Sequence, residues 1–154
     1  MSFFTIAAIQ MQVNTTTENV SAMAQQLNNL MLRFPAVQMV VFPELCAFGP
    51  AKALAQPAGG EVEQAFCDMA RRHKIWLVPG SVYERSGEQI YNMAPVIDPD
   101  GQVVAAAVVQ VGFGFDPPEA FVSRLATRHD QRGRGLGQAL LVDDAYSLDD
   151  TFML

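Results

Sequence analysis

Two kinds of hydrophobic pattern alternate along the first part of the chain. Residues 3–10 are rich in Phe, Ile and Ala and are expected to form a first strand. Residues 37–42 are a nearly continuous apolar run, which is typical of a strand buried on both faces of a parallel sheet. Between them, apolar residues recur at helical spacing over residues 20–34, and Thr16 or Thr17 is expected to cap this helix. A strand, a helix and a strand joined by short links predict a βαβ unit with a right-handed crossover.

A second helix and further strands are expected downstream. Apolar residues recur at helical spacing over residues 62–73, and residues 75–78 form another short apolar run. Turn-forming residues then separate the runs 82–84 and 90–97 from the run that begins at Val103, which favours antiparallel strands. Together these patterns predict an α/β fold with a mixed sheet.

Composition limits the functions that this chain can have. Half of its 154 residues are hydrophobic, so a packed core is expected, and the net charge of −6 argues against general binding of nucleic acid. No apolar run approaches the ~20 residues of a membrane span, and the N-terminus has no basic segment of a signal peptide, so we expect a cytoplasmic protein with no membrane partner. The spacing of Cys46, Cys67, His73 and His129 predicts no metal site.

Glu44 is the candidate catalytic residue. It follows the apolar run 37–42 and Pro43, and proline cannot continue a central strand because it lacks the N–H group. Glu44 is therefore expected at the carboxyl end of a buried strand, where open α/β sheets place their ligands.

An ordered set of segments resembles the first half of a carbon–nitrogen hydrolase of the nitrilase superfamily. After the first strand and helix, the set comprises Phe42-Pro43-Glu44-Leu45, Val78-Pro79-Gly80-Ser81, Tyr91-Asn92-Met93-Ala94 and Asp98-Pro99-Asp100-Gly101. The resemblance covers residues 3–104, approximately. It implies part of an αββα layer and hydrolysis of a small amide or nitrile substrate without a cofactor.

The resemblance also assigns a role to Glu44. In that superfamily the matching glutamate is the general base of a Glu-Lys-Cys triad, in which the thiol attacks the substrate and the lysine stabilises the developing oxyanion. The lysine follows the Asp-Gly turn and its next strand, but here no lysine comes after Lys74 and no cysteine comes after Cys67. We therefore expect an inactive hydrolase. Cys46 is close enough to Glu44 to be an alternative nucleophile, although both cysteines are more simply interpreted as buried apolar residues.

Residues 117–145 carry a different signal. A short strand over residues 123–127 is followed by a glycine-rich loop and a helical run, an order that resembles the acetyl-coenzyme A loop of GNAT-type N-acetyltransferases. This resemblance implies acetyl-CoA as a cofactor, with backbone N–H groups of the loop on its pyrophosphate. The residues that would bind it are Arg132, Gly133, Arg134, Gly135, Leu136 and Gly137.

Three interpretations therefore stand together. The first is a hydrolase-like segment over residues 1–112, followed by a GNAT-like segment over residues 113–154 that ends in a frayed acidic terminus. The second is an acetyl-CoA-binding fragment, and the third is a truncated or recombined chain without enzymatic function, whose parts meet near residues 104–117. Half of an αββα layer leaves apolar surface exposed, so we also expect a homo-oligomer.

Overall fold

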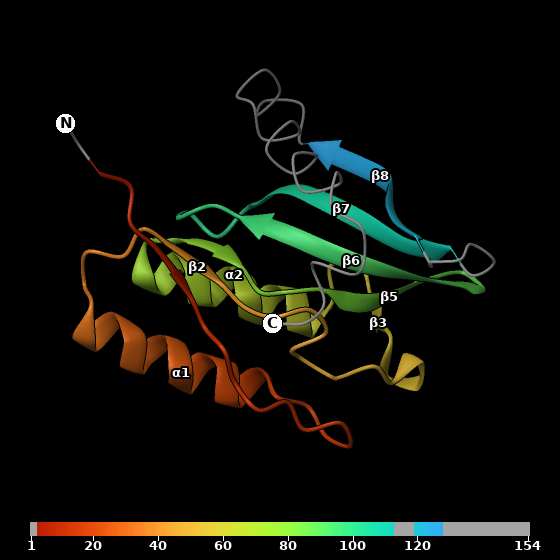
Figure 1. Ribbon diagram of the computed structural model, residues 1–154, viewed down its shortest axis with the longest axis horizontal. Helices are drawn as coiled ribbons and strands as arrows, with labels where there is room; N and C mark the ends of the chain where they lie inside the picture. Colours follow the sequence, from red (N-terminus) through yellow and green to blue (C-terminus); the bar gives the residue numbers. More distant parts are fainter. Residues whose placement is uncertain (1–2, 113–118, 128–154) are drawn as a thin grey trace.

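The computed structural model describes residues 3–112 and 119–127 (Figure 1). The predictions for the glycine-rich loop and for the acidic C-terminal segment lie outside these described residues. Within these ranges the fold is α/β, as predicted. In chain order the elements are β1 (Ile6–Ala8), α1 (Val20–Arg33), β2 (Met39–Val41), the 3-10 helix η1 (Lys52–Leu54), β3 (Gln56–Pro57), α2 (Glu61–His73), β4 (Trp76–Val78), β5 (Val82–Ser86), β6 (Gln89–Ile97), β7 (Val103–Gly112) and β8 (Glu119–Thr127).

All of these strands belong to one mixed sheet. Its order is β1-β2-β4-β6-β5-β3, with β7 paired to β6 and β8 paired to β7. The strands β1, β2 and β4 are parallel, which confirms the predicted βαβ unit, whereas β6 is antiparallel to β4, β5 and β7. The strand predicted over residues 123–127 is part of β8, which pairs with β7 across the predicted domain boundary at residue 112.

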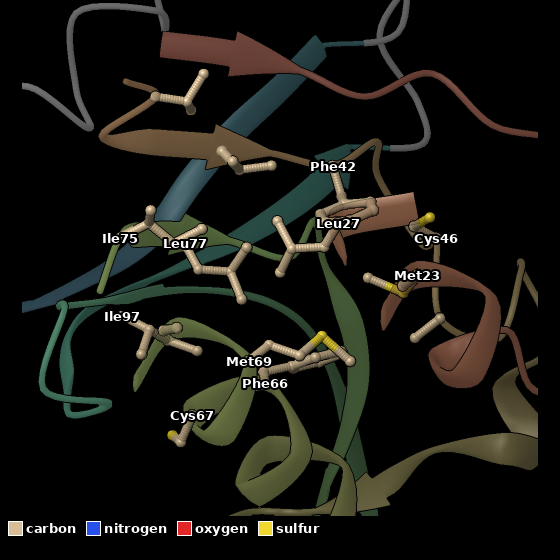
Figure 2. Close-up of a cluster of buried hydrophobic side chains, with 14 residues drawn as sticks. Met23, Leu27, Phe42, Cys46, Phe66, Cys67, Met69, Ile75, Leu77 and Ile97 are labelled. Atoms are coloured by element: carbon tan, nitrogen blue, oxygen red, sulfur yellow. The ribbon is translucent and has the colours of Figure 1, made fainter. Parts of the chain in front are cut away.

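Both α-helices pack against the same face of the sheet. Met23 and Leu27 of α1 and Phe66 of α2 are almost fully buried, and they share one core cluster with Val40 of β2 and Leu77 of β4. Figure 2 shows side chains from the two helices and from the sheet converging on this core. The apolar faces predicted from helical spacing are therefore the faces that the helices bury.

The other face of the sheet carries a smaller apolar cluster. It contains Val96, Val104 and Ala105, with Trp76 and Val78 packed against them. Successive residues of a strand point to opposite faces, so Trp76 and Val78 flank Leu77 but face away from the helices. The sheet thus has one face covered by α1 and α2 and a second face that neither helix covers.

The start of α1 differs from the prediction that Thr16 or Thr17 caps it. The helix begins at Val20, whose N–H donates to a carboxylate oxygen of Glu18 at 2.6 Å, and Asn19 occupies the cap position. The Asn19 side chain instead donates to the carbonyl oxygens of Asn14 and Ala47, at 2.8 and 3.3 Å. The buried Asn19 side chain thus ties the loop before α1 to the loop after β2.

Candidate active site

Glu44 lies just beyond the carboxyl end of β2, as the sequence predicts. The pairing of β2 with β4 extends one residue past the strand, where the N–H of Phe42 donates to the carbonyl oxygen of Val78 at 2.8 Å. Pro43 follows, and the chain then turns away from the sheet with the Glu44 side chain exposed. The carboxylate is therefore presented to solvent from a rigid base that consists of buried parallel strands.

The backbone immediately after Glu44 is strained. Leu45 adopts a φ of +50°, a left-handed conformation that costs a non-glycine residue about 1 kcal/mol or more. Its N–H donates to the hydroxyl oxygen of Ser81 at 3.1 Å, and its carbonyl oxygen accepts from the N–H of Gly49 at 2.7 Å. Ser81 is itself buried. These bonds hold the turn that aims Glu44.

Gly80 allows the loop after β4 to approach this turn. A Cβ atom at Gly80 would lie 1.8 Å from the carbonyl oxygen of Pro43, and its φ is +77°. Only glycine tolerates both the conformation and the contact without a shift of the backbone. Two segments that are distant in the sequence thus form one packed unit, Phe42-Pro43-Glu44-Leu45 and Val78-Pro79-Gly80-Ser81. The residues joined by their hydrogen bond, Leu45 and Ser81, are 36 positions apart.

Asn92 supplies the side chain that contacts the Glu44 carboxylate. Asn92 lies on β6, and its Nδ2 donates a hydrogen bond to Oε1 of Glu44 at 2.8 Å. The Oδ1 atom of Asn92 is buried and has no hydrogen-bond partner among the described residues. In the sequence, Asn92 stood out only as a member of the ordered resemblance, and no local pattern pointed to its contact with Glu44.

The charges and thiols near Glu44 do not complete a catalytic set. The ion pairs between described residues join Arg71 to Asp68 and Lys74 to Asp100, and neither involves Glu44. Cys46 is fully buried, and this burial raises its pKa to about 11. A thiol with that pKa stays protonated at neutral pH, so Cys46 is a core residue and not a nucleophile.

Cys67 and His73 lie on α2, where their contacts are those of structural residues. Cys67 is buried, and burial together with the nearby Glu63 raises its pKa. His73 Nε2 is 2.8 Å from Oδ1 of Asn28, so the pair links α2 to α1, and burial followed by the charge of Arg72 lowers the pKa of the imidazole. The described ranges contain no group of three or more His, Cys, Asp or Glu side chains arranged for a metal ion.

A match to a family model shows which family this chain belongs to. The model of the carbon-nitrogen hydrolase family matches residues 5–143. The chain belongs to the carbon–nitrogen hydrolase family. The first predicted resemblance is thereby confirmed, and the match continues beyond residue 104 and through the region where two families were expected to meet.

Similar sequences and solved structures belong to amide hydrolases and other members of the nitrilase superfamily by name. The chain is 32% identical over 109 residues to the omega-amidase NIT2 of Danio rerio, which covers 68% of this chain and 39% of the relative. The fold resembles an amidase from Nesterenkonia sp. with a TM-score of 0.61 at 22% identity, covering 71% of this chain and 44% of the amidase. It also resembles Nit3 of Saccharomyces cerevisiae with a TM-score of 0.58 at 20% identity, covering 68% and 44%. This carbon–nitrogen hydrolase family member thus spans about two fifths of the length of the omega-amidase that it matches.

The resemblance to an acetyl-CoA loop receives no support from these comparisons. The family match includes residues 117–143, which are most of the segment concerned, and Arg132 to Gly137 lie outside the part of the chain that the structure describes.

None of the described helices is long and apolar enough to cross a membrane.

Proposed function

We propose that this carbon–nitrogen hydrolase family member carries the general-base part of an amide-hydrolysing site, and that its 154 residues alone do not hydrolyse an amide. The observation that carries the proposal is the Glu44 carboxylate, which a strained turn presents at the end of β2 and Asn92 holds at 2.8 Å. The names of the relatives, an omega-amidase and an amidase, favour an amide over a nitrile as the substrate class.

Glu44 meets the geometric requirement for a general base. Its side chain is exposed, so a substrate or a nucleophile can reach it, and one of its oxygens already accepts a hydrogen bond that restricts its orientation. Proton abstraction needs this combination of access and fixed geometry. Asn92 is a positioning residue in this scheme, because it acts on the reaction through Glu44.

The other two members of the family's triad, a nucleophilic thiolate and an oxyanion-stabilising lysine, are not supplied by this sequence. A nucleophilic thiolate is missing, since both cysteines are buried and the pKa of each is raised. The lysine that stabilises the oxyanion in this family has no counterpart either, since no lysine follows Lys74. A base without a nucleophile and an oxyanion donor does not complete acyl transfer.

A hydrolysis assay tests the absence of turnover. Ammonia release from small primary amides is measured with the 154-residue chain and with Glu44→Gln, which keeps the size of the side chain but cannot accept a proton. We expect equal background rates for both proteins. Ammonia release that exceeds the buffer rate and is lost in Glu44→Gln contradicts the proposal.

Binding tests the choice of substrate class. Titration with propionamide, followed by NMR of the Asn92 side-chain amide, is expected to shift that signal in the wild-type chain and to shift it less in Glu44→Gln. Butyronitrile, which has no N–H donor for the carboxylate, serves as the matched ligand. A larger shift with the nitrile, or no shift with the amide up to its solubility limit, argues against an amide site.

A further inference from the structure

A small hollow lies between α2 and the face of the sheet that the helices cover. Its walls come from α2 and from the strands β3, β5, β6 and β7, and its volume is about 40 Å³. Among its lining residues, Phe66 and Pro95 are apolar and buried, whereas Glu63 and Glu84 are only half-buried. A water molecule needs about 10–15 Å³ on this scale, so the hollow has room for about three non-hydrogen atoms. We call it the α2 hollow.

Glu63 and Glu84 bring two like charges to different walls of the α2 hollow. Glu63 belongs to the first turn of α2, and Glu84 lies on β5. Burial, followed by the charge of Glu63, raises the pKa of Glu84. The two carboxylates are therefore close enough to repel each other, and their half-buried position limits the screening by water.

No cation among the described residues neutralises this pair. The ion pairs between described residues involve neither Glu63 nor Glu84. Tyr83 and Arg85 flank Glu84 on β5, so their side chains lie on the other face of the sheet. Lys52 stands over the ring of Tyr83 and therefore belongs to that other face as well. The α2 hollow thus combines an apolar interior with two carboxylates that lack a positive partner.

We propose that the α2 hollow binds a small primary alkylammonium ion, with its NH₃⁺ group between Glu63 and Glu84 and its alkyl chain against Phe66. An ammonium group has three N–H donors and no acceptor, which suits a pair of carboxylates. Ca²⁺ and Mg²⁺ need about six oxygen ligands, whereas the oxygen-bearing side chains in this lining are the two glutamates and Gln56. Room for about three non-hydrogen atoms corresponds to ethylammonium.

The α2 hollow is separate from the candidate active site. Met93 lines the hollow, and its neighbour Asn92, which holds Glu44, points to the opposite face of β6. Binding of an amine in the hollow therefore does not depend on the function proposed for Glu44, and each can fail without the other.

Met93 also provides the signal that tests the proposal. In a chain with ¹³C-labelled methionine methyl groups, titration with ethylammonium chloride is expected to shift the Met93 signal. The dissociation constant should be about a millimolar or weaker, because three non-hydrogen atoms cannot bind more tightly. Met69, which does not line the hollow, is the internal reference, and sodium chloride at the same ionic strength controls for screening.

Ethanol is the matched ligand, since it has the size of ethylammonium but no charge, and it is expected to leave the Met93 signal unchanged. Equal shifts with the two ligands overturn the proposal. The same conclusion follows if ethylammonium gives no saturable shift of Met93 at concentrations well above the millimolar range.

Two variants test the contribution of the carboxylates. Glu84→Gln keeps the size of the side chain and removes its charge, so the dissociation constant of ethylammonium is expected to rise more than about tenfold. Glu88→Gln removes the same charge at an exposed position between β5 and β6, and it is expected to change the constant less than about twofold. Equal effects of the two substitutions would show that the net charge of the chain, and not the α2 hollow, attracts the amine.

Ala106→Val tests the hollow itself. Ala106 lies on β7 and lines the hollow, so the substitution adds two carbon atoms where there is room for about three and leaves both carboxylates in place. Valine suits a strand, and the fold is expected to persist, which circular dichroism checks. We expect ethylammonium binding to be lost. Binding that Ala106→Val leaves unchanged would place the amine on the solvent side of the carboxylates and overturn the proposed site.

Discussion

Gly80 lies against Pro43 so closely that a Cβ atom at Gly80 would be 1.8 Å from the Pro43 carbonyl oxygen. This contact joins the loop after β4 to the loop that carries Glu44. The position of the candidate base therefore depends on a glycine in another part of the sequence.

Gly80→Ala is expected to lower the free energy of unfolding by about 3 kcal/mol, because it adds overpacking to the cost of a positive φ. Urea-induced unfolding measures the loss. Gly87→Ala is the matched control, since Gly87 also has a positive φ, +61°, but nothing lies within 4 Å of its added Cβ. We expect Gly87→Ala to cost only about 1 kcal/mol, and equal losses in the two variants would count against the close contact.

The hydrogen bond between Asn92 and Glu44 is expected to appear as a coupling energy. In a double-mutant cycle of Asn92→Ala and Glu44→Ala, we compare the losses in the free energy of unfolding. The sum of the losses in the two single variants should exceed the loss in the double variant by about 1 kcal/mol. Because one partner is exposed, the value is expected near the low end for a bond to a charged group. Additive losses would show that the 2.8 Å contact contributes nothing measurable to stability.

The burial of His73, followed by the nearby charge of Arg72, predicts a dependence of stability on pH. The folded state lowers the pKa of His73 from its ordinary value near 6.5, so the unfolded chain binds a proton at a higher pH than the folded chain. This contribution is complete above about pH 6.5 and is lost as the pH falls through the folded pKa. Urea unfolding at pH 8 and at pH 5.5 measures it.

His73→Gln is the control for this pH effect. Glutamine can still donate to Asn28 but does not titrate, so the part of the acid-induced loss that is due to His73 is expected to disappear. A wild-type chain and a His73→Gln variant with the same pH dependence would contradict a lowered pKa for His73.

Cys46 is expected to react with thiol reagents only when the chain unfolds. Its side chain is fully buried and its pKa is about 11, so at pH 8 the folded protein offers neither access nor thiolate. Labelling with iodoacetamide, followed by peptide mass spectrometry, should give a Cys46 rate that tracks global unfolding in increasing urea. Rapid labelling of Cys46 in native buffer would restore it as a candidate nucleophile.

The local pattern of the sequence determined much of the fold. Alternating apolar runs and helical spacing predicted β1, α1, β2, α2 and β4, because amphipathic periodicity reports directly which face of an element is buried. Pro43 predicted where β2 ends, because a residue without an N–H group cannot continue a central strand. The position of Glu44 at the carboxyl end of a buried strand followed from these two facts.

The tertiary structure decided which groups surround Glu44. Asn92 is 48 positions away and reaches the carboxylate because β4 and β6 follow β2 in the sheet, an order that no local spacing encodes. The same holds for the burial that raises the pKa of Cys46 and for the open edge at β1, since both depend on what packs against a residue from distant parts of the chain. Sequence periodicity fixes the buried face of each element, whereas the hydrogen-bond partners, pKa values and exposed edges arise only when the elements are assembled.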